Sequence, residues 1–427
     1  MECGGDDTAL DPPVERKTPV LVAIQSGVVA TALHIKYMTP TVRLKKHEQR
    51  RILQGHLWVF SNEVAEVDAE AENGSIVKLE DAAHNVLGMG FYNKNSLIAV
   101  RLFSRKDETI DRAFFERRLL DAAALRSVVY PESTAYRLAH GESDLLPGLI
   151  IDRYNDSYVV QMLSAGMQAI QPMIVEILCE TFKARTVFAR NDSSLRALEG
   201  LSAESVTLFG EPTPEIITDG MLDFEVDVVA GQKTGFFYDQ RLNRMAIRPF
   251  CKGARVLDCH SNIGGFALHA ASAGAAEVIG VDSSATALEA AARNAERNGL
   301  EEVCSWITGD SMKVLKSFVD KREQFDIVVL DPPAYAKNKK TLSTALNAYV
   351  ELQTLGLLLV KKGGILATSS CSHHVSSAVF DEVINAAAVK THRYLQIIER
   401  RGAAPDHPVL AGMDETEYLK FRMCRVL

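Results

Sequence analysis

The chain has 427 residues, of which 47% are hydrophobic and 24% are charged, values typical of a globular protein with two or three domains. These values exclude a disulfide-stapled miniprotein and argue against collagen-like, disordered and membrane-embedded chains. With 47 basic and 55 acidic residues the formal net charge is −8, so a nucleic-acid partner would have to be bound by a local basic surface.

The seven cysteines are odd in number and include no CxxC pair, which argues against a metal site and against a secreted disulfide framework. The apolar stretch 19–35 is interrupted by polar residues and is short for a membrane helix. It also follows acidic rather than basic residues, unlike a signal peptide. We therefore expect a cytoplasmic protein without a membrane partner. Residues 1–40 are expected to be a disordered extension or to precede the true start.

Three folded parts are predicted in chain order. Short strands separated by turns indicate a small β domain over residues 41–105. Residues 106–224 combine several strands with a helix that begins after Asp111, an expected N-cap, and indicate an α+β middle domain. From residue 225 to 427, strands alternate with helices as in a doubly wound parallel sheet, so the predicted fold class is α/β.

The segment RVLDCHSNIGGF predicts a strand, a turn and a helix that bind an adenosine cofactor. Gly264 and Gly265 would let the backbone approach a ligand, and Asp282, which ends the next strand, could accept both ribose hydroxyls. The turn lacks the GxGxxG pattern expected beneath a pyrophosphate, so S-adenosylmethionine is favoured over NAD. Two alternatives stay open: Asp282 could merely cap the next helix, and Asp310 could either contact adenine or cap a helix.

Two later strands bring reactive side chains to the same edge of the sheet. FDIVVLDPPAY places Asp331 at a strand end stiffened by two prolines, with Tyr335 able to stack on a base. ATSSCS places Cys371 on the same rim. A thiolate that adds to carbon 6 of a pyrimidine makes carbon 5 nucleophilic enough to take a methyl group, and a carboxyl group at the polar edge of the base stabilises the adduct.

Cys371 would need activation, because a free thiol is only about a few per cent thiolate at neutral pH. His373 and His374 are nearby basic groups in the sequence. The alternative for any single cysteine is a small buried apolar side chain. We expect that alternative for Cys259, which lies inside the first strand of the cofactor half.

A basic run near the start of the β domain, beside the aromatic Trp58, indicates RNA binding through phosphate contacts. The target base would have to leave its stack to reach a thiol on the rim of the sheet. The alternative is a solvated strand edge with Trp58 in a core. The basic residues of the run are Arg43, Lys45, Lys46, Arg50 and Arg51.

Several separate motifs carry a resemblance to a known family: HLWVFSNEV, YRLAHGESDLLPGLIIDRY, GQKTGFFYDQR, DCxSxxGGF, LDPPAY, SSCS and APDHPV. From about Thr41 to Leu427 the chain resembles the RlmI/YccW-like family of bacterial large-subunit ribosomal RNA methyltransferases. This resemblance implies a PUA domain, an α+β middle domain and a class I (Rossmann-like) methyltransferase domain. It further implies S-adenosylmethionine as cofactor, large-subunit ribosomal RNA as partner and 5-methylcytosine as product, and it leaves monomer and homodimer open.

The same resemblance implies the site residues. Cys371 would be the nucleophile and Asp331 its carboxylate partner. A lid loop, 231–241, would close over the cofactor, as its glycines and aromatic residues also indicate. The residues expected at the cofactor are Phe236, Tyr238, Gln240, Asp258, Ser261, Gly264, Gly265, Asp282, Asp310 and Asp331.

The chain departs from the family pattern at Asn262 and Ile263, where relatives often carry Tyr-Thr, and at Tyr335, where Phe is common. Ala334 stands where some other RNA cytosine methyltransferases carry a second cysteine. Another group must therefore help to eliminate the thiol, and the sequence does not identify it.

Three other functions remain open on the sequence alone. The first is methylation of an exocyclic base amine, for instance of guanine, by Asp331 and Tyr335 without a covalent adduct. The second is a nucleotide-dependent oxidoreductase, which the missing GxGxxG disfavours. The third is a non-catalytic RNA-binding protein with a relic methyltransferase domain.

Overall fold

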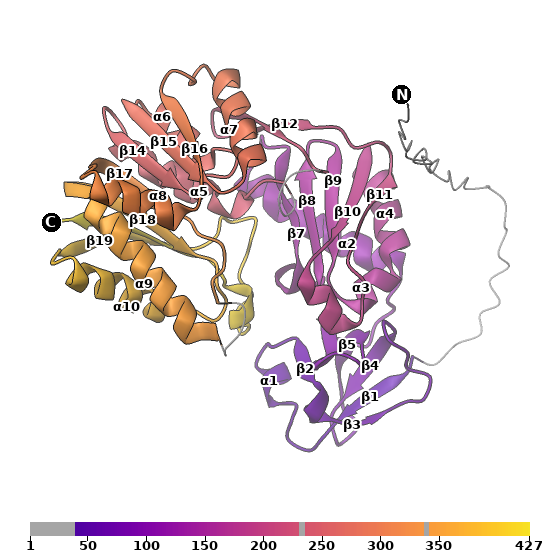
Figure 1. Cartoon of the computed structure of the whole chain (residues 1–427). Helices are drawn as coiled ribbons and strands as arrows, with labels where there is room; N and C mark the ends of the chain where they lie inside the picture. The colour runs from indigo at the N-terminus through magenta and orange to yellow at the C-terminus, as the bar shows by residue number, and fades with distance from the viewer. Residues whose placement is uncertain (1–38, 230–234, 337–340) are drawn as a thin grey trace, which may run out of the picture. The chain divides into compact units, whose positions relative to one another are not determined.

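The computed structural model describes residues 39–229, 235–336 and 341–427 (Figure 1). The predicted extension, residues 1–40, lies outside the described residues except for its last two positions. Part of the predicted lid loop, residues 231–234, lies outside them as well. Within the described ranges no helix combines the length and the apolar character needed to cross a membrane.

The first part of the described chain is a six-stranded sheet in the order β2-β6-β5-β4-β1-β3, as the short-strand pattern predicts. Alternate residues of each strand, such as Val42 and Leu44 or Val77 and Leu79, point into one apolar core. Its elements are β1 (Thr41–Leu44), α1 (Arg50–Leu53), β2 (Trp58–Phe60), β3 (Val64–Val67), β4 (Ile76–Glu80), β5 (Val86–Tyr92) and β6 (Ile98–Ser104).

The middle part is a five-stranded sheet in the order β11-β10-β9-β8-β7, with helices packed on it. The predicted N-cap is confirmed, because the carboxylate of Asp111 accepts a hydrogen bond of 2.9 Å from the backbone N–H of Phe114. The elements are α2 (Arg112–Val129), β7 (Ala135–His140), β8 (Leu149–Tyr154), β9 (Ser157–Met162), α3 (Ala165–Ala169), α4 (Gln171–Glu180), β10 (Thr186–Asn191) and β11 (Glu204–Phe209).

A separate hairpin, β12 (Glu215–Asp219) and β13 (Leu222–Val226), links the middle sheet to the last one. Strand β13 runs across the boundary that the sequence suggests between residues 224 and 225. Its backbone is bound to the next part, since the N–H of Glu225 donates to the side chain of Asn294 at 2.8 Å.

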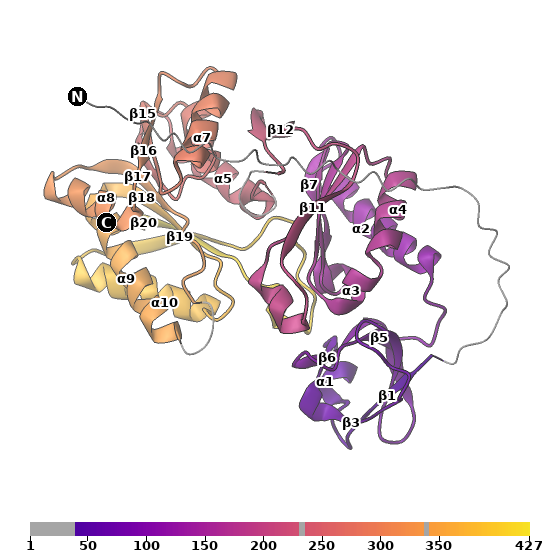
Figure 2. The ribbon, with the colours of Figure 1, turned by 45° about the vertical axis from the view of Figure 1, so that its right-hand side comes forward.

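The last part is the predicted doubly wound α/β domain, with a seven-stranded sheet in the order β16-β15-β14-β17-β18-β20-β19. The first five strands are parallel and β20 is antiparallel to both of its neighbours. Helices α8, α9 and α10 pack on one face, and α5 and α6 on the other (Figure 2). The elements are α5 (Arg241–Ile247), β14 (Arg255–Cys259), α6 (Gly265–Ser272), β15 (Glu277–Asp282), α7 (Ala285–Arg297), β16 (Cys304–Thr308), α8 (Ser311–Asp320), β17 (Phe325–Leu330), α9 (Leu342–Leu359), β18 (Val360–Ser370), α10 (Ser377–Lys390), β19 (Leu395–Arg401) and β20 (Lys420–Val426).

The strand order reverses at β14, because the chain continues from it to β15 on one side and later to β17 on the other. In open α/β sheets ligands bind in the crevice that such a reversal leaves at the carboxyl ends of the strands. The residues that follow β14, β15, β17 and β18 are therefore the ones positioned for function.

A buried ionic cluster centred on Asp219 connects the hairpin to α5 and α6. Its carboxylate accepts hydrogen bonds from Nε of Arg241 at 2.8 Å and from Nε of Arg244 at 2.9 Å, and Nε2 of His269 lies 3.2 Å away. Burial alone would raise the pKa of Asp219, but the two guanidinium groups and the hydrogen bond to His269 hold it well below its usual range. The cluster is therefore stable only while Asp219 is ionised.

Replacing Asp219 by asparagine should lower the free energy of unfolding by about 3–5 kcal/mol, because two buried guanidinium groups would lose their counter-charge. Urea denaturation of wild type and variant measures the difference. The control is Asp223→Asn in the same hairpin, where the residue is exposed and the change should be about 0.5 kcal/mol or less. Equal losses in the two variants would contradict the role given to the cluster.

Candidate active site

A cavity of about 300 Å³ lies at the carboxyl ends of β14, β15, β17 and β18. It brings together seven of the residues that the sequence predicts: Phe236, Gln240, Ser261, Gly265, Asp282, Asp331 and Cys371. It also includes residues that the sequence did not predict as contacts: Phe237, Asp239, Arg244, His260, Asn262, Ile263, Phe266, Ser283, Pro332, Pro333 and Leu419.

The turn after β14 takes an unusual backbone path along one wall of the cavity. His260, Asn262 and Gly264 all have positive φ angles, of 64°, 51° and 88°. At Gly264 a Cβ atom would come within 3.0 Å of the Trp306 ring, so the glycine is required by both conformation and space. At Gly265 a Cβ would lie 3.2 Å from Cδ of Arg244, so this glycine makes room for an arginine that lines the cavity.

Asp258 lies beneath this turn and is almost completely buried. Its Oδ2 accepts hydrogen bonds from Oγ of Ser261 at 2.7 Å and from the N–H of Ala267 at 3.0 Å. Its Oδ1 is buried without a hydrogen-bond partner among the described residues. Burial, with a smaller contribution from the charges of Asp331 and Asp282, raises the pKa of Asp258 to about 7 against the hydrogen bonds from Ser261 and Ala267, which lower it.

Asp282 holds the same turn from the end of β15. Its Oδ2 accepts from the N–H of Asn262 and its Oδ1 from the N–H of Ser284, both at 2.9 Å. The N-cap of α7 is Ser284, so Asp282 is not merely a helix cap. Asp310, in contrast, is exposed, does not line the cavity and caps α8 through a 3.0 Å bond from the N–H of Lys313. Asp310 therefore caps a helix, which is the alternative that the sequence left open.

Gln240 fixes the carboxyl group of Asp331. Its side-chain Nε2 donates to Oδ1 of Asp331 at 2.8 Å and to Oγ of Ser369 at 3.0 Å, while its Oε1 accepts from Asn243 at 2.6 Å. With every amide group used and only 3% of the residue exposed, Gln240 cannot rotate freely. The residue that the resemblance assigns to the cofactor thus also orients the predicted catalytic carboxylate.

Two aromatic residues of the lid segment have different positions. Phe236 lines the cavity, with its ring centroid 4.6 Å from Cζ of Arg244. Tyr238 does not line it; the hydroxyl donates to the carbonyl of Arg153 at 2.9 Å, and the ring packs against Tyr154. The structure therefore does not bring Tyr238 to the cavity.

Cys371 and Asp331 line the same cavity from neighbouring parallel strands, β18 and β17. Cys371 is half-buried, and its Sγ atom lies 3.8 Å from the carbonyl oxygen of Pro332. Tyr335 points elsewhere, since its ring lies 4.7 Å from that of Tyr349 and it is not among the lining residues. Burial raises the pKa of Tyr335 to about 12. Cys259 is fully buried in the core, as predicted.

A buried lysine lies next to Cys371. Lys420 pairs with Ser370 between β20 and β18, and its Nζ donates to the carbonyls of Ser372 at 2.7 Å and Tyr418 at 2.6 Å. Among the described residues no carboxylate lies within ion-pair distance of this ammonium group. Burial lowers the pKa of Lys420 to about 8, and the charge of Cys371 opposes that shift.

His373 and His374, which the sequence proposed as activating groups, are both exposed, and the His373 ring lies 5.6 Å from the ring of Tyr418. Lys420 was missed because it follows Cys371 by about fifty residues in the sequence. The only sequence signal is a lysine at the start of a short final strand, KFRMCRV, in which basic and apolar residues are mixed. Nothing in that pattern shows that the strand inserts beside β18.

Three residues of the predicted basic run are bound within the β domain. Arg43 pairs with Glu66, and its guanidinium lies 3.6 Å from Glu80; Arg51 pairs with Glu63 at 2.6 Å. Lys45 donates to the backbone carbonyl of Asn62 at 2.7 Å. Lys46 and Arg50 are exposed and have no ion pair within the described ranges. Trp58 donates its indole N–H to Glu142 of the middle part at 2.9 Å.

Comparisons with known proteins agree with this architecture. A family model for a PUA-like domain matches residues 42–105, and one for an S-adenosylmethionine-dependent methyltransferase matches residues 186–422. The ribosomal RNA large subunit methyltransferase I of Aliivibrio fischeri (strain ATCC 700601 / ES114) is 37% identical over 396 residues, which cover 91% of this chain and all of the relative. The enzyme of the same name from Klebsiella pneumoniae (strain 342) is 37% identical over 394 residues, covering 91% and 98%.

The chain belongs to the ribosomal RNA large subunit methyltransferase I family. Among solved structures, a methyltransferase in complex with SAH has the same fold, with a TM-score of 0.78 and 20% identity over 90% of this chain and 99% of that one. A SAM-dependent methyltransferase from Streptococcus mutans has a TM-score of 0.77 at the same identity and coverage. Family membership confirms the expected combination of a PUA-like domain, a middle α/β region and a methyltransferase domain, and with it the expected cofactor, S-adenosylmethionine.

The cavity of this family member fits a cofactor that is cationic and carries no phosphate. The carboxyl groups of Asp258, Asp282 and Asp331 lie close enough to raise the pKa of Asp258, so a sulfonium and an ammonium group would relieve their repulsion, whereas a pyrophosphate would increase it. Nε2 of His260, in the wall of the cavity, is buried without a hydrogen-bond partner in the described part of the chain. It is available to a polar group of the ligand.

Replacing Asp258 by asparagine should flatten the pH dependence of stability. The raised pKa keeps the folded carboxyl group neutral while the unfolded one ionises, so its contribution to stability is lost as the pH rises from about 4 to about 7. The variant lacks this loss, and its stability relative to wild type should increase by on the order of 2 kcal/mol from pH 5 to pH 7. Urea denaturation across this range measures it; parallel curves for the two proteins would contradict the assignment.

Proposed function

We propose that this protein transfers a methyl group from S-adenosylmethionine to carbon 5 of a cytosine in large-subunit ribosomal RNA, through a transient covalent bond to Cys371. The substrate class is supported by the names of relatives that the chain matches over nine-tenths of its length. The chemistry rests on one observation: the thiol of Cys371 and the carboxyl group of Asp331 line one cavity at the ends of neighbouring strands.

In the proposed reaction the thiolate of Cys371 forms a bond to carbon 6 of the base, and the electron pair of the 5,6 double bond becomes available at carbon 5. S-adenosylmethionine supplies the methyl group that carbon 5 takes up. Loss of the carbon-5 proton then restores the double bond as the bond between carbon 6 and sulfur breaks. Asp331, held by Gln240, would hydrogen-bond the polar edge of the cytosine and stabilise the adduct.

The cofactor would be held by cavity residues from the lid segment, the turn and the strand ends: Phe236, Gln240, Ser261, Gly265, Asp282 and Asp331. Asp258 and Gly264 would act from behind the turn by fixing its conformation. The division of labour along the chain would be RNA binding by residues 41–105, support by residues 106–224 and catalysis by residues 225–427.

The decisive test is nucleoside mass spectrometry of large-subunit ribosomal RNA from cells that lack this gene and carry wild type, Cys371→Ala or Cys179→Ala. Cys179 is a half-buried cysteine far from the site in sequence and serves as the control. One 5-methylcytosine should be lost without the gene and restored by wild type and the control only. Full complementation by Cys371→Ala, or loss of a methylated amine instead, would replace the covalent mechanism by methylation of an exocyclic amine.

Lys420 is proposed to position the segment after Cys371 and to favour its thiolate. Lys420→Met should therefore slow alkylation of Cys371 by iodoacetamide at pH 7 by roughly tenfold, because an adjacent positive charge lowers a thiol pKa by about one unit. Peptide mass spectrometry follows Cys371 alone, and the whole pH profile should move upward. Lys420→Arg should retain most of the reactivity, and the exposed Lys321→Met should not change it. A purely structural role would leave the midpoint of the profile unmoved.

A further inference from the structure

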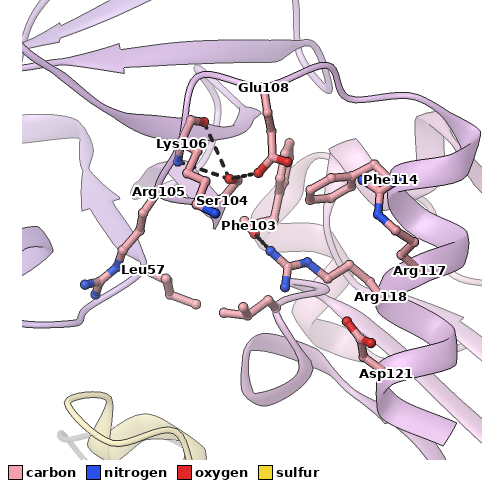
Figure 3. Close-up of a pocket in the computed structure, with 11 residues that line it drawn as sticks. Leu57, Phe103, Ser104, Arg105, Lys106, Glu108, Phe114, Arg117, Arg118 and Asp121 are labelled. Atoms are coloured by element: carbon pink, nitrogen blue, oxygen red, sulfur yellow. Dashed lines mark hydrogen bonds between the residues drawn. The ribbon is translucent and has the colours of Figure 1, made fainter. Parts of the chain in front are cut away.

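A second cavity, of about 360 Å³, lies where the β domain meets α2 (Figure 3). Its walls come from Leu57 just before β2, the end of β6, the segment between β6 and α2, and the first turns of α2. Leu145, between β7 and β8, completes the lining. The apolar part of the wall is Leu57, Phe103, Phe114 and Leu145, and the polar part is Ser104, Arg105, Lys106, Glu108, Arg117, Arg118 and Asp121. We call it the junction cavity.

Four cations line the junction cavity and none of them is neutralised by an ion pair within the described residues: Arg105, Lys106, Arg117 and Arg118. Two acidic residues near these cations have partners of their own. Glu108 accepts a hydrogen bond from Ser104, as Figure 3 shows, and Asp107 pairs with Lys78 at 2.6 Å. Two acids, Glu108 and Asp121, line the cavity against four cations, so positive charge is in excess there.

Two of the guanidinium groups are held in place by an aromatic ring. Cζ of Arg118 lies 5.1 Å and Cζ of Arg117 6.0 Å from the ring centroid of Phe114, which is itself buried. Arg118 also donates to the carbonyl of Phe103 at 3.2 Å. The N–H donors of Arg118 are therefore oriented before any ligand binds, which lowers the entropic cost of binding a phosphate group.

The junction cavity contrasts with the basic run of the β domain. In that run Arg43 and Arg51 are paired with carboxylates and Lys45 with a carbonyl, so much of its charge is compensated inside the protein. In a chain of net charge −8, four cations without ion pairs in the described ranges outnumber the two acids around this cavity and form a local positive field. Such a field attracts a polyanion, and paired guanidinium groups match the geometry of phosphate oxygens.

We propose that the junction cavity binds the sugar–phosphate backbone of the RNA substrate, away from the nucleotide that is methylated. This proposal rests on the proposed function for the identity of the RNA. Contacts to phosphates carry no sequence information, so the cavity would set the position and orientation of the RNA while the active site selects the base.

The test compares the triple variant Arg105→Gln, Lys106→Gln, Arg117→Gln with wild type and with a control that removes the same charge elsewhere, Lys313→Gln, Lys321→Gln, Lys390→Gln. All six residues are exposed, so both variants should fold, which circular dichroism and S-adenosylmethionine binding verify. The probes are purified large-subunit ribosomal RNA and single-stranded poly(U), each titrated at several salt concentrations.

We expect the triple variant of the junction cavity, the junction variant, to bind ribosomal RNA at least about tenfold more weakly than wild type at about 0.1 M salt. The slope of log affinity against log salt should become less steep by about 2 to 3, because each lost phosphate contact removes close to one unit. The control variant should match wild type. Equal affinity and slope for the junction variant and the control would overturn the proposal.

Two further measurements separate this proposal from the proposed function. Cys371→Ala, which lacks the proposed nucleophile, should bind RNA with the wild-type salt slope, so loss of methylation chemistry leaves the junction result interpretable. If the junction variant loses poly(U) binding as well, backbone recognition is supported. If it binds both RNAs normally but loses binding to a protein of the ribosomal particle, the cavity is a protein-docking site and the proposal is wrong.

Discussion

The geometry of the candidate active site depends on a charge that lies outside it. Asp219, buried in the hairpin before the methyltransferase sheet, holds Arg241 and Arg244 of α5 and meets His269 of α6. These contacts fix the start of α5, where Gln240 reaches across to Asp331 and Ser369. They also fix Arg244 in the wall of the cavity. Arg244 contacts the ring of Phe236 and packs over Gly265, where a Cβ atom would come too close to it. The ionised carboxylate of Asp219 thus helps to fix the position of the lid segment relative to the sheet.

The charges around the candidate site also bear on which ligand would fit it. Burial raises the pKa of Asp258, the charges of Asp331 and Asp282 add to that rise, and hydrogen bonds from the turn offset part of it. A cationic cofactor bound in this cavity would be attracted by these carboxyl groups. On the far side of the cavity the sign is reversed, since the buried ammonium group of Lys420 lies beside Cys371. Negative charge near the cofactor and positive charge near the thiol suit a transfer from a sulfonium to a base activated by a thiolate.

The sequence predicts the parts of this site that depend on local pattern. Asp282 ends an apolar strand, and Asp331 and Cys371 each follow one. Because parallel strands have their carboxyl ends at one edge of the sheet, the convergence of these residues could be inferred without coordinates. Lys420 and Leu419 could not be inferred, because β20 inserts antiparallel between β18 and β19, and only pairing across fifty residues reveals it. Tyr238 and Tyr335 carried the right chemistry for binding, but each is turned toward another tyrosine.

The basic run shows why counting charges along a sequence is not enough. Five cations within nine residues suggest an RNA surface, yet strand pairing places Arg43 beside glutamates of β3 and β4, and the turn before β3 brings Glu63 to Arg51. Arg105, Lys106, Arg117 and Arg118 are spread over a strand end, a connection and a helix, so no single window marks them. What makes a cation available to a ligand is the absence of an internal partner, and that property appears only when distant acids have been placed. The same condition singles out Lys420, whose ammonium group is held by two backbone carbonyls, with no carboxylate within ion-pair distance among the described residues, and lies beside the thiol of Cys371.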